Sequence, residues 1–234
     1  MKPPLFWAPP EKIQNGRVTF PAQESHHFQE VLRLRTGDPV RVFDGTGRIY
    51  GCILRSSAEG VYGEVVGEEP APQRLSTIVL GIGLLGTERF DWVVEKATEL
   101  QVARIVPLVT QYSQSSGRPA RLERWRRIAL AACKQSGNLI IPKVEEPMPF
   151  QQFLREATED NRWILQEHGG RLPVEKGAEG SAALLVGPEG GWHSDEIQLA
   201  AAAGFVGITL VGTTLRAETG ALAGLILIRR WMDW

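Results

Sequence analysis

Cysteine is scarce in this chain, and long hydrophobic runs are absent. Its two cysteines among 234 residues, Cys52 and Cys133, lie far apart in the sequence. A disulfide framework is therefore excluded, and a reducing compartment is favoured. No apolar run reaches the roughly 18 residues that a membrane span requires, and the N-terminal MKPPLFWAPPEK lacks the apolar core of a signal peptide. We expect a cytoplasmic protein with no membrane partner.

Sequence patterns for metal binding and for common nucleophilic chemistry are also missing. The four histidines do not combine with the cysteines at the spacing of a metal site, so no metal is expected. No G-x-S-x-G turn marks a nucleophilic serine, and no lysine–serine pair follows a glycine run as it does in a phosphate-binding P-loop. The histidines are His26, His27, His168 and His193.

The segment GIGLLG (81–86) matches the dinucleotide-binding pattern G-x-G-x-x-G. The acidic residue expected about 20 residues further on is missing, because that region reads IVPLVTQYS. The helix that follows is predicted to start late, at about Glu88, so its N-terminus would not meet a pyrophosphate. We interpret the match as fortuitous, and a Rossmann oxidoreductase is a distant alternative.

Charge is nearly balanced overall, at a net −1, but two segments are basic. Residues 118–134 carry six basic side chains against Glu123 alone, a net charge of +5. Residues 33–55 carry five arginines against Asp38 and Asp44. A single basic helix is most simply a solvated face. Two basic segments in a neutral protein favour an anionic partner that binds at one face.

The chain divides into two predicted parts, residues 1–70 and residues 75–234. In the first, three β-type segments carry hairpin signals such as Asp44-Gly45 and Thr46-Gly47. One helical stretch, 25–35, interrupts them, with Phe28, Val31, Leu32 and Arg35 on one side, which predicts a small β-barrel with an inserted helix. The polar, proline-containing segment 68–74 suits a linker. The β-type segments are 12–20, 38–54 and 60–68.

From residue 75 onward strands alternate with helices, which predicts an α/β fold with a mostly parallel sheet. The helix predicted over 88–100 has a buried stripe of Phe90, Val93, Val94, Ala97 and Leu100. The helix predicted over 194–203 has Ser194 as its N-cap, acidic residues in its first turn, and Gly204 as its stop. The expected strands are 75–82, 103–109, 162–167, 182–187 and 205–211; the other expected helices are 119–136, 149–159 and 217–231.

Two glycine- or threonine-rich turns are the best candidates for a site. LLVGPEGGWHSDEI (184–197) and LVGTTLRAETGALAGLILI (210–228) each lead from an apolar run into a predicted helix. Glycines there permit close backbone approach to a ligand, although a plain turn and a capped helix start would also explain them. Core packing does not explain the polar residues Glu189, Arg216, Glu218 and Thr219. The sequence therefore predicts that the two turns are walls of one small-molecule pocket.

Together with HHFQEVLRLRTGDPVRVFDG (26–45), ERFDWVVEKATELQVARIVPLVTQYS (88–113) and RWRRIALAACKQSGNLIIP (124–142), these turns resemble the RsmE family of ribosomal RNA methyltransferases. Members of this family methylate N3 of a uridine in 16S ribosomal RNA. The resemblance implies an N-terminal PUA-like RNA-binding β-barrel, a C-terminal SPOUT domain with a trefoil knot, and a homodimer. A knot is a rare exception to the usual chain topology, and pattern reasoning alone does not propose one.

The resemblance also implies S-adenosylmethionine as cofactor and the small ribosomal subunit as partner. Arg216 is the implied catalytic residue that stabilises the uridine anion, with Glu218 or Glu189 positioning it or accepting the proton. The implied RNA contacts are Arg33, Arg35, Lys96, Arg124, Arg127 and Gln135. The implied cofactor-binding residues are Leu165, Gln166, Glu167, Val186, Gly187, Pro188, Gly190, Gly191, Leu210, Val211, Gly212, Thr214, Leu215 and Arg216.

The chain departs from the family pattern at several positions, among them Gln101 in place of a glycine, Asn138 in place of an arginine, Leu85 in place of a lysine, and Gly220 in place of an alanine. Most of these changes fall on the side expected to meet RNA. Two alternatives therefore stay open. One is a related methyltransferase with another RNA target, and the other is a ribosome-assembly factor that binds RNA without catalysis.

Overall fold

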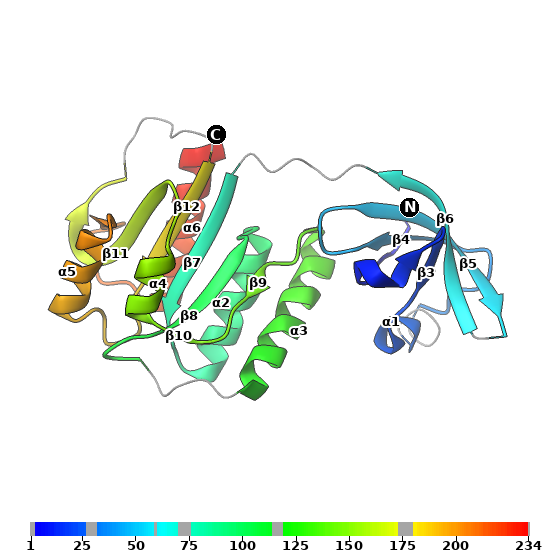
Figure 1. Ribbon diagram of the computed structural model, residues 1–234, viewed down its shortest axis with the longest axis horizontal. Helices are drawn as coiled ribbons and strands as arrows, with labels where there is room; N and C mark the ends of the chain where they lie inside the picture. Colours follow the sequence, from blue (N-terminus) through cyan, green and yellow to red (C-terminus); the bar gives the residue numbers. More distant parts are fainter. Residues whose placement is uncertain are drawn as a thin grey trace. The chain divides into compact units, whose positions relative to one another are not determined.

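The computed structural model describes residues 3–26, 32–58, 60–69, 76–113, 119–172 and 180–233 (Figure 1). The chain forms two compact units. The first contains Met1–Gln73 together with Cys133–Ile141, and the second contains Arg74–Ala132 and Pro142–Trp234. In the described part of the chain, no helix is long and apolar enough to cross a membrane.

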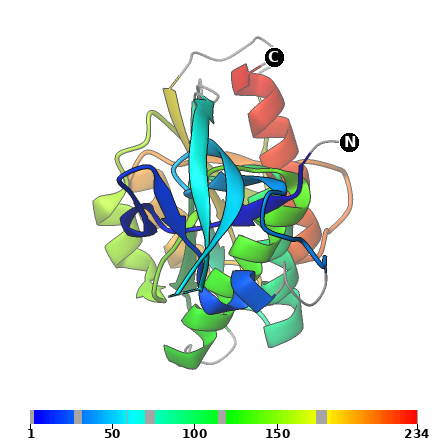
Figure 2. The same cartoon turned by 90° about the vertical axis from the view of Figure 1, so that its right-hand side faces the viewer.

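The first unit is built on a six-stranded sheet with strand order β1-β4-β5-β6-β3-β2 (Figure 2). The pair β1–β4 is parallel and the other pairs are antiparallel. Inward-facing residues such as Phe6, Val18, Val42 and Leu54 form its core. The elements are β1 (Leu5–Trp7), a 3-10 turn η1 (Pro10–Lys12), β2 (Ile13–Gln14), β3 (Arg17–Thr19), α1 (Ala22–His26), β4 (Pro39–Phe43), β5 (Ile49–Ser57) and β6 (Gly60–Glu69).

The hairpin predicted at Asp44-Gly45 and Thr46-Gly47 is confirmed between β4 and β5. Gly45 and Gly47 adopt φ of 85° and 115°, which a glycine reaches without steric cost. The Thr46 backbone N–H donates to Asp44 Oδ1 at 2.8 Å and closes an Asx turn. The later segment Cys133–Ile141 joins this unit, since the Ile141 N–H donates to the Gly45 carbonyl at 2.9 Å.

The helix predicted over 25–35 is wrong at its C-terminal end. Helix α1 covers Ala22–His26, and residues 32–35 are not helical. Leu32 is exposed rather than part of a buried face, while Phe28 and Val31 lie outside the described residues. In the predicted linker, β6 continues through Glu69, and residues 70–74 lie outside the described part.

The second unit contains a seven-stranded sheet, and all of its strand pairs are parallel, which confirms the predicted α/β fold. The main strand order is β10-β8-β7-β12-β11-β13, with β9 beside β8. The strands are β7 (Ser76–Gly83), β8 (Arg104–Val109), β9 (Lys143–Val144), β10 (Met148–Pro149), β11 (Asn161–Gly170), β12 (Gly180–Val186) and β13 (Val206–Ile208). The helices are α2 (Thr87–Glu99), α3 (Pro119–Ser136), α4 (Phe150–Glu156), α5 (Ser194–Ala202) and α6 (Ala217–Asp233).

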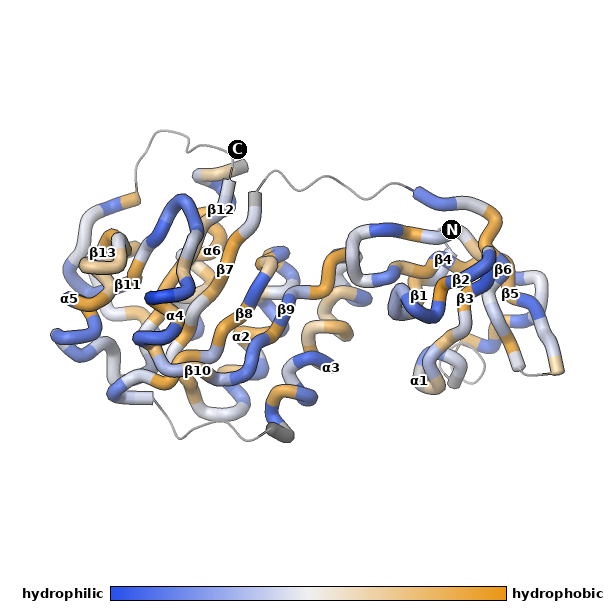
Figure 3. The backbone as a smooth tube through the Cα atoms, viewed as in Figure 1, coloured by the Kyte–Doolittle hydropathy of each residue, from blue (hydrophilic) through white to orange (hydrophobic). Residues whose placement is uncertain are grey.

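Helices cover both faces of this sheet. Alternate strand residues such as Ile78, Leu80 and Ile82 of β7 pack against α2, α3 and α6, in one core cluster. Strand residues that point to the other face of the sheet, such as Ala183 and Leu185 of β12, pack with α4 and α5 in a second cluster. Both faces are therefore buried, and the central strand β7 is hydrophobic over much of its length (Figure 3).

Helix α2 carries four of the five residues of the predicted buried stripe, and the fifth, Leu100, is partly buried at its C-cap. The helix ends in a Schellman motif. Phe90, Val93, Val94 and Ala97 are each no more than 1% exposed. The Val102 N–H donates to the Ala97 carbonyl and the Gln101 N–H to the Thr98 carbonyl. Gln101 occupies the left-handed position of this motif, at φ 60°. The glycine that the family pattern has at this point is therefore the residue that the backbone favours.

Replacing Gln101 by glycine is expected to stabilise the protein. A left-handed residue with a Cβ costs about 1–2 kcal/mol, and the greater freedom of glycine in the unfolded chain offsets about 0.4–1 kcal/mol of that gain. We expect Gln101→Gly to raise the free energy of unfolding by about 0.5–1 kcal/mol in urea denaturation. Gln101→Ala, which keeps the Cβ, is the control and gives no gain; a less stable glycine variant would contradict this account.

Candidate functional site

A cavity of about 730 Å³ opens in the second unit, beside the second half of strand β11 and at the carboxyl ends of strands β12 and β13. This volume is in the range of small-molecule sites, and the carboxyl ends of parallel strands are where α/β sheets bind ligands. Its walls come from three chain segments, residues 165–168, 186–192 and 209–217, together with Arg89 of α2 and Ile197 of α5.

The cavity brings together nearly all of the residues that the resemblance implied for the cofactor. Only Gly212 of that set is not among its lining residues. Of the implied catalytic residues, Glu189 and Arg216 line the cavity and Glu218 does not. Sequence reasoning did not single out the remaining lining residues, although all but His168 and Thr209 lie within the segments that carry the resemblance; they are Arg89, His168, Trp192, Ile197, Thr209, Thr213 and Ala217.

The first wall is an excursion of strand β11. Leu165 and Gly170 both pair with Ile208 of β13, so residues 166–169 leave the ladder between them. A Cβ on Gly169 would stand 2.8 Å from the Ile208 backbone, and one on Gly207 would stand 1.8 Å from Gln166 Nε2. Glycines at these two positions therefore make room for the excursion, which carries Gln166, Glu167 and His168 to the cavity.

The second wall is the glycine turn after β12. Its position depends on Gly83, because a Cβ there would stand 2.6 Å from the backbone nitrogen of Pro188. Gly190 likewise admits the side chain of Tyr112, whose Cβ would lie 2.8 Å from an added Cβ. Gly191 adopts φ 73° and its N–H donates to the Pro188 carbonyl. Close protein packing thus explains Gly83 of the fortuitous GIGLLG match and part of the glycine content of the turn.

Hydrogen bonds tie the three walls to one another. The Trp192 indole N–H donates to the Leu165 carbonyl at 2.9 Å, and its ring lies 5.0 Å from that of Phe150. The Thr214 hydroxyl donates to Glu167 Oε1 at 3.2 Å. The first wall is therefore held by the second and by the third.

The prediction that Ser194 caps helix α5 is wrong, because the N-cap is His193. The His193 imidazole accepts from the Asp195 N–H, and Glu196 Oε2 accepts from the His193 N–H at 2.9 Å. The other oxygen of the buried Glu196 carboxylate accepts from the Gln111 N–H at 2.9 Å. The capping box starts one residue earlier than the serine suggests, and it also fastens the segment after β8.

Two arginines and two glutamates line the cavity. Arg89 forms an ion pair with Glu189, which holds that carboxylate beside the first turn of α2. Arg216 is exposed at the residue before α6, and its carbonyl accepts the Gly220 N–H at 2.8 Å. Glu218 Oε2 is buried, and within the described residues it has no hydrogen-bond partner.

Comparisons with known proteins agree with this architecture. Residues 71–229 match the family model for an RNA methyltransferase domain, and residues 20–66 match that for an RNA methyltransferase PUA domain. Ribosomal RNA small subunit methyltransferase E of Synechocystis sp. is 31% identical over 96% of this chain and 76% of its own length. The chain belongs to the ribosomal RNA small subunit methyltransferase E family.

Further relatives carry the same name. The protein of Mycobacterium bovis is 30% identical over 89% of this chain and 86% of its own length. A crystal structure of the Neisseria gonorrhoeae protein bound to S-adenosyl methionine superposes with a TM-score of 0.88, at 28% identity and with 98% of each chain covered. The chain is thus an RNA methyltransferase with an N-terminal PUA-type domain.

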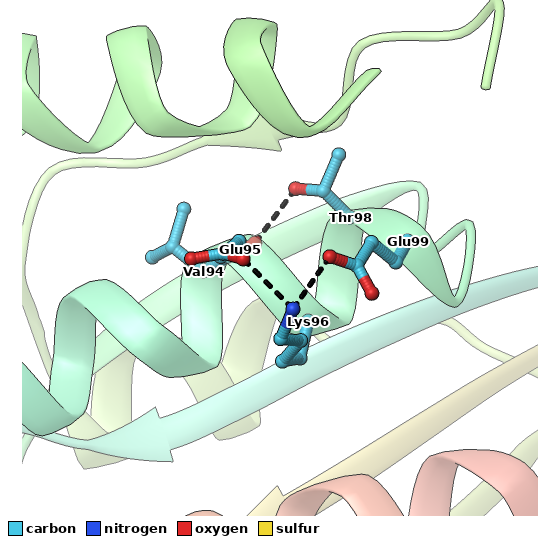
Figure 4. Close-up of polar contacts among 5 residues, drawn as sticks. All are labelled: Val94, Glu95, Lys96, Thr98 and Glu99. Atoms are coloured by element: carbon cyan, nitrogen blue, oxygen red, sulfur yellow. Dashed lines mark hydrogen bonds and ion pairs between the residues drawn. The ribbon is translucent and has the colours of Figure 1, made fainter. Parts of the chain in front are cut away.

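Two of the five cations expected to meet RNA in this methyltransferase, Lys96 and Arg124, are paired with acids. Lys96 Nζ lies 2.7 Å from both Glu95 Oε1 and Glu99 Oε1 (Figure 4). The hydrogen bonds that Lys96 donates to these carboxylates raise the pKa of Lys96. Arg124 contacts Asp91 Oδ2 through two nitrogens, each at 2.7 Å, and this hydrogen bonding raises the pKa of Arg124. A phosphate at either position would compete with a carboxylate that is already in place.

Acids far away in the sequence balance much of both basic segments. In the first unit, Arg41, Arg48 and Arg55 pair with Glu69, Glu68 and Glu64 of strand β6. Lys134 pairs with Glu24 at 2.6 Å. Arg33, Arg35 and Gln135 are exposed, as is Arg127, whose Nε donates to the Glu123 carbonyl at 3.4 Å. The structure therefore leaves fewer cations available for RNA than the sequence counts predict.

Adding one methyl group at Gly83 should test the close contact with Pro188. We expect Gly83→Ala to lower the free energy of unfolding by about 1–3 kcal/mol, as overpacking does, measured by urea denaturation. Gly86→Ala in the same GIGLLG segment is the matched control, because the nearest atom to its added Cβ is 4.0 Å away. Equal losses for the two variants would contradict the role of the Gly83 contact.

Proposed function

We propose that this protein transfers a methyl group from S-adenosylmethionine to N3 of a uridine in the 16S ribosomal RNA of the small subunit. The observation that carries the proposal is that the three implied loops meet at one cavity, with Arg216 on its wall. Membership of the ribosomal RNA small subunit methyltransferase E family supports the substrate class. Because that substrate is ribosomal RNA, we also propose that the protein acts in the cytoplasm.

The residues of the cavity suit S-adenosylmethionine. The apolar side chains of Leu165, Val186, Leu210 and Leu215 can contact an adenine ring, and the glycine turn offers backbone groups to its polar edge. In the described part of the chain, no lysine lines the cavity, and the charges of its two arginines and two glutamates cancel. A cationic sulfonium is therefore not repelled. When bound, S-adenosylmethionine supplies a methyl group activated by that positive sulfur.

The chain's own task is to hold the uridine base and to favour its N3 anion. Uridine N3 is a weak acid and becomes nucleophilic when it loses its proton. The Arg216 guanidinium, placed beside the base edge, stabilises the negative charge that develops there. The buried oxygen of Glu218 lies two residues away in the chain, and Glu189 is held by Arg89. We assign the carboxylates of Glu218 and Glu189 to holding Arg216 in position at the cavity wall.

We further propose that residues 1–70 act as a PUA-like RNA-binding barrel and that residues 75–234 form a SPOUT methyltransferase domain with a trefoil knot. The target base would be turned out of its RNA stack to reach the cavity. The proposed contacts to the RNA are Lys96, Arg124, Gln135, Arg33, Arg35 and Arg127. Among the described residues, no acidic side chain balances the charge of Arg33, Arg35 or Arg127, which are exposed.

A homodimer fits the outer face of helix α6. Its residues Leu225 and Ile228 pack into the core, whereas Ile226 and Leu227 are 52% and 41% exposed. Neighbouring exposed apolar side chains on a long helix are typical of a surface that a second chain covers. We propose that this face lies in the dimer interface.

Charged residues on this face should separate the two chains. We expect Ile226→Glu combined with Leu227→Glu to convert a dimer into a monomer in size-exclusion chromatography with light scattering. Val206→Glu, at another exposed apolar side chain, is the control and should stay dimeric. A dimer that survives the double change would place the interface elsewhere.

The decisive experiment for function is methyl transfer to purified small subunits that lack the modification, followed by mass spectrometry of the methylated nucleotide. We expect 3-methyluridine at a single site in 16S RNA. Methylation of another RNA or another base atom would favour a related methyltransferase. Binding of S-adenosylmethionine in calorimetry without any transfer would favour an assembly factor.

Removal of the Arg216 guanidinium should slow methylation strongly. We expect Arg216→Ala to lower kcat by about 100-fold or more, as loss of one charge-stabilising donor does, in single-turnover assays with small subunits. Arg216→Lys should recover part of the rate because it restores the positive charge. Full methylation by the alanine variant would remove Arg216 from the mechanism.

A further inference from the structure

The excursion of strand β11 brings to the cavity a histidine that no motif indicates. His168 lies between Glu167 and Gly169 in the segment that leaves the ladder, and it lines the cavity. Within the described residues its exposed side chain makes no hydrogen bond or ion pair, and no other histidine lines this site. We propose that His168 is the catalytic residue that accepts the N3 proton of the target uridine, an inference that rests on the function proposed above.

The other ionisable groups of the cavity are less suited to this task. Glu189 is engaged by the Arg89 guanidinium, so protonating it would break an ion pair. Glu167 accepts a hydrogen bond from the Thr214 hydroxyl at 3.2 Å. Arg216 is a cation and has no proton-accepting capacity. Glu218 is not among the lining residues.

An imidazole is chemically well matched to the requirement. A general base works best when its protonation range lies near the operating pH, and imidazole is the side chain whose ordinary range does so. The charged groups that share the cavity with His168 are Glu167 on the same strand, Glu189 after β12, Arg89 from α2 and Arg216 before α6. These positive and negative charges are equal in number.

The proposed step balances in atoms and charge. The N3–H bond of uridine breaks and its proton moves to a ring nitrogen of His168. The electron pair left on N3 forms the new N–C bond to the donated methyl group, while the pair of the old C–S bond stays on sulfur. The sulfonium charge is thereby lost, and the imidazolium releases its proton to water, so each turnover yields one proton.

Substitution of His168 separates proton transfer from binding. We expect His168→Asn to lower kcat near neutral pH by about 100-fold or more, the typical contribution of a general base. Its dissociation constant for S-adenosylmethionine, measured by calorimetry without RNA, should stay within about twofold of the wild-type value, because a proton acceptor adds little to ground-state binding.

The pH profile gives a readout that a structural role would not change. As the pH rises, hydroxide ionises a growing share of uridine N3, so the deficit of His168→Asn should shrink steadily. Added imidazole should restore part of the rate of His168→Ala and should not affect the wild type. Arg216→Ala, whose deficit does not come from a missing base, serves as the comparison and should not respond to imidazole.

Three outcomes would overturn the inference about His168. These are an unchanged rate in His168→Asn, a deficit that is constant with pH, and a loss of cofactor affinity that matches the loss of rate. Failure of the proposed function looks different, because the wild-type protein itself would then form no 3-methyluridine in small subunits.

Discussion

The contact between Pro188 and the backbone of Gly83 is the constraint on which the geometry of the cavity depends. Strand β12 pairs with β7 over its whole length, Gly180 with Ser76 through Val186 with Ile82, and β7 continues by one residue, Gly83. The chain leaving β12 must then turn across the end of β7, and only a residue without a Cβ leaves space for it. Trp192 and Glu189 continue from this turn, and they hold the β11 excursion and helix α2. A displacement of Pro188 would therefore shift the glycine turn and, through Trp192, the β11 excursion, which are two walls of the cavity.

Many charged side chains in this protein interact with a nearby opposite charge rather than contributing to an overall field. The basic residues that stand together in the sequence meet acids from other elements, as Arg124 meets Asp91 and Arg55 meets Glu64. With a net charge of −1, the molecule has no strong overall field to draw in RNA. Under the proposed function, discrimination of the RNA substrate would then depend on the few arginines that pair with no acid in the described part of the chain and on the shape of the site. Exposed ion pairs such as Arg126–Glu123 add little to the stability of the fold.

Sequence patterns were sufficient for the elements whose periodicity reflects burial. The stripe of α2 and the parallel strands β7, β8 and β12 follow directly from apolar spacing, because both faces of the sheet and one face of the helix are covered. The short strands β9 and β10 could not be predicted, since two residues carry no period.

The capping role of His193 was missed because it requires the return contact from Glu196, and serine is ordinarily the better cap. The pairing of distant acids with the basic segments depends on tertiary contacts that no local window contains, as does the placement of Cys133–Ile141 with the first unit. Most of the residues that line the cavity were accessible through the resemblance, whereas His168 carries no signal in the sequence and becomes visible only through the excursion that exposes it.

The way β11 leaves and rejoins its neighbour has an evolutionary consequence. Leu165 and Gly170 share one partner, Ile208, so the strand pairing on either side does not depend on how many residues lie between them. Insertions or deletions at this point would leave the alternation of core and surface residues in the sheet intact, whereas a one-residue slip inside a regular strand inverts it. The segment can thus exchange its side chains and change its length while the hydrophobic core stays fixed. Chemistry at this wall of the cavity can diverge among relatives faster than the fold that supports it.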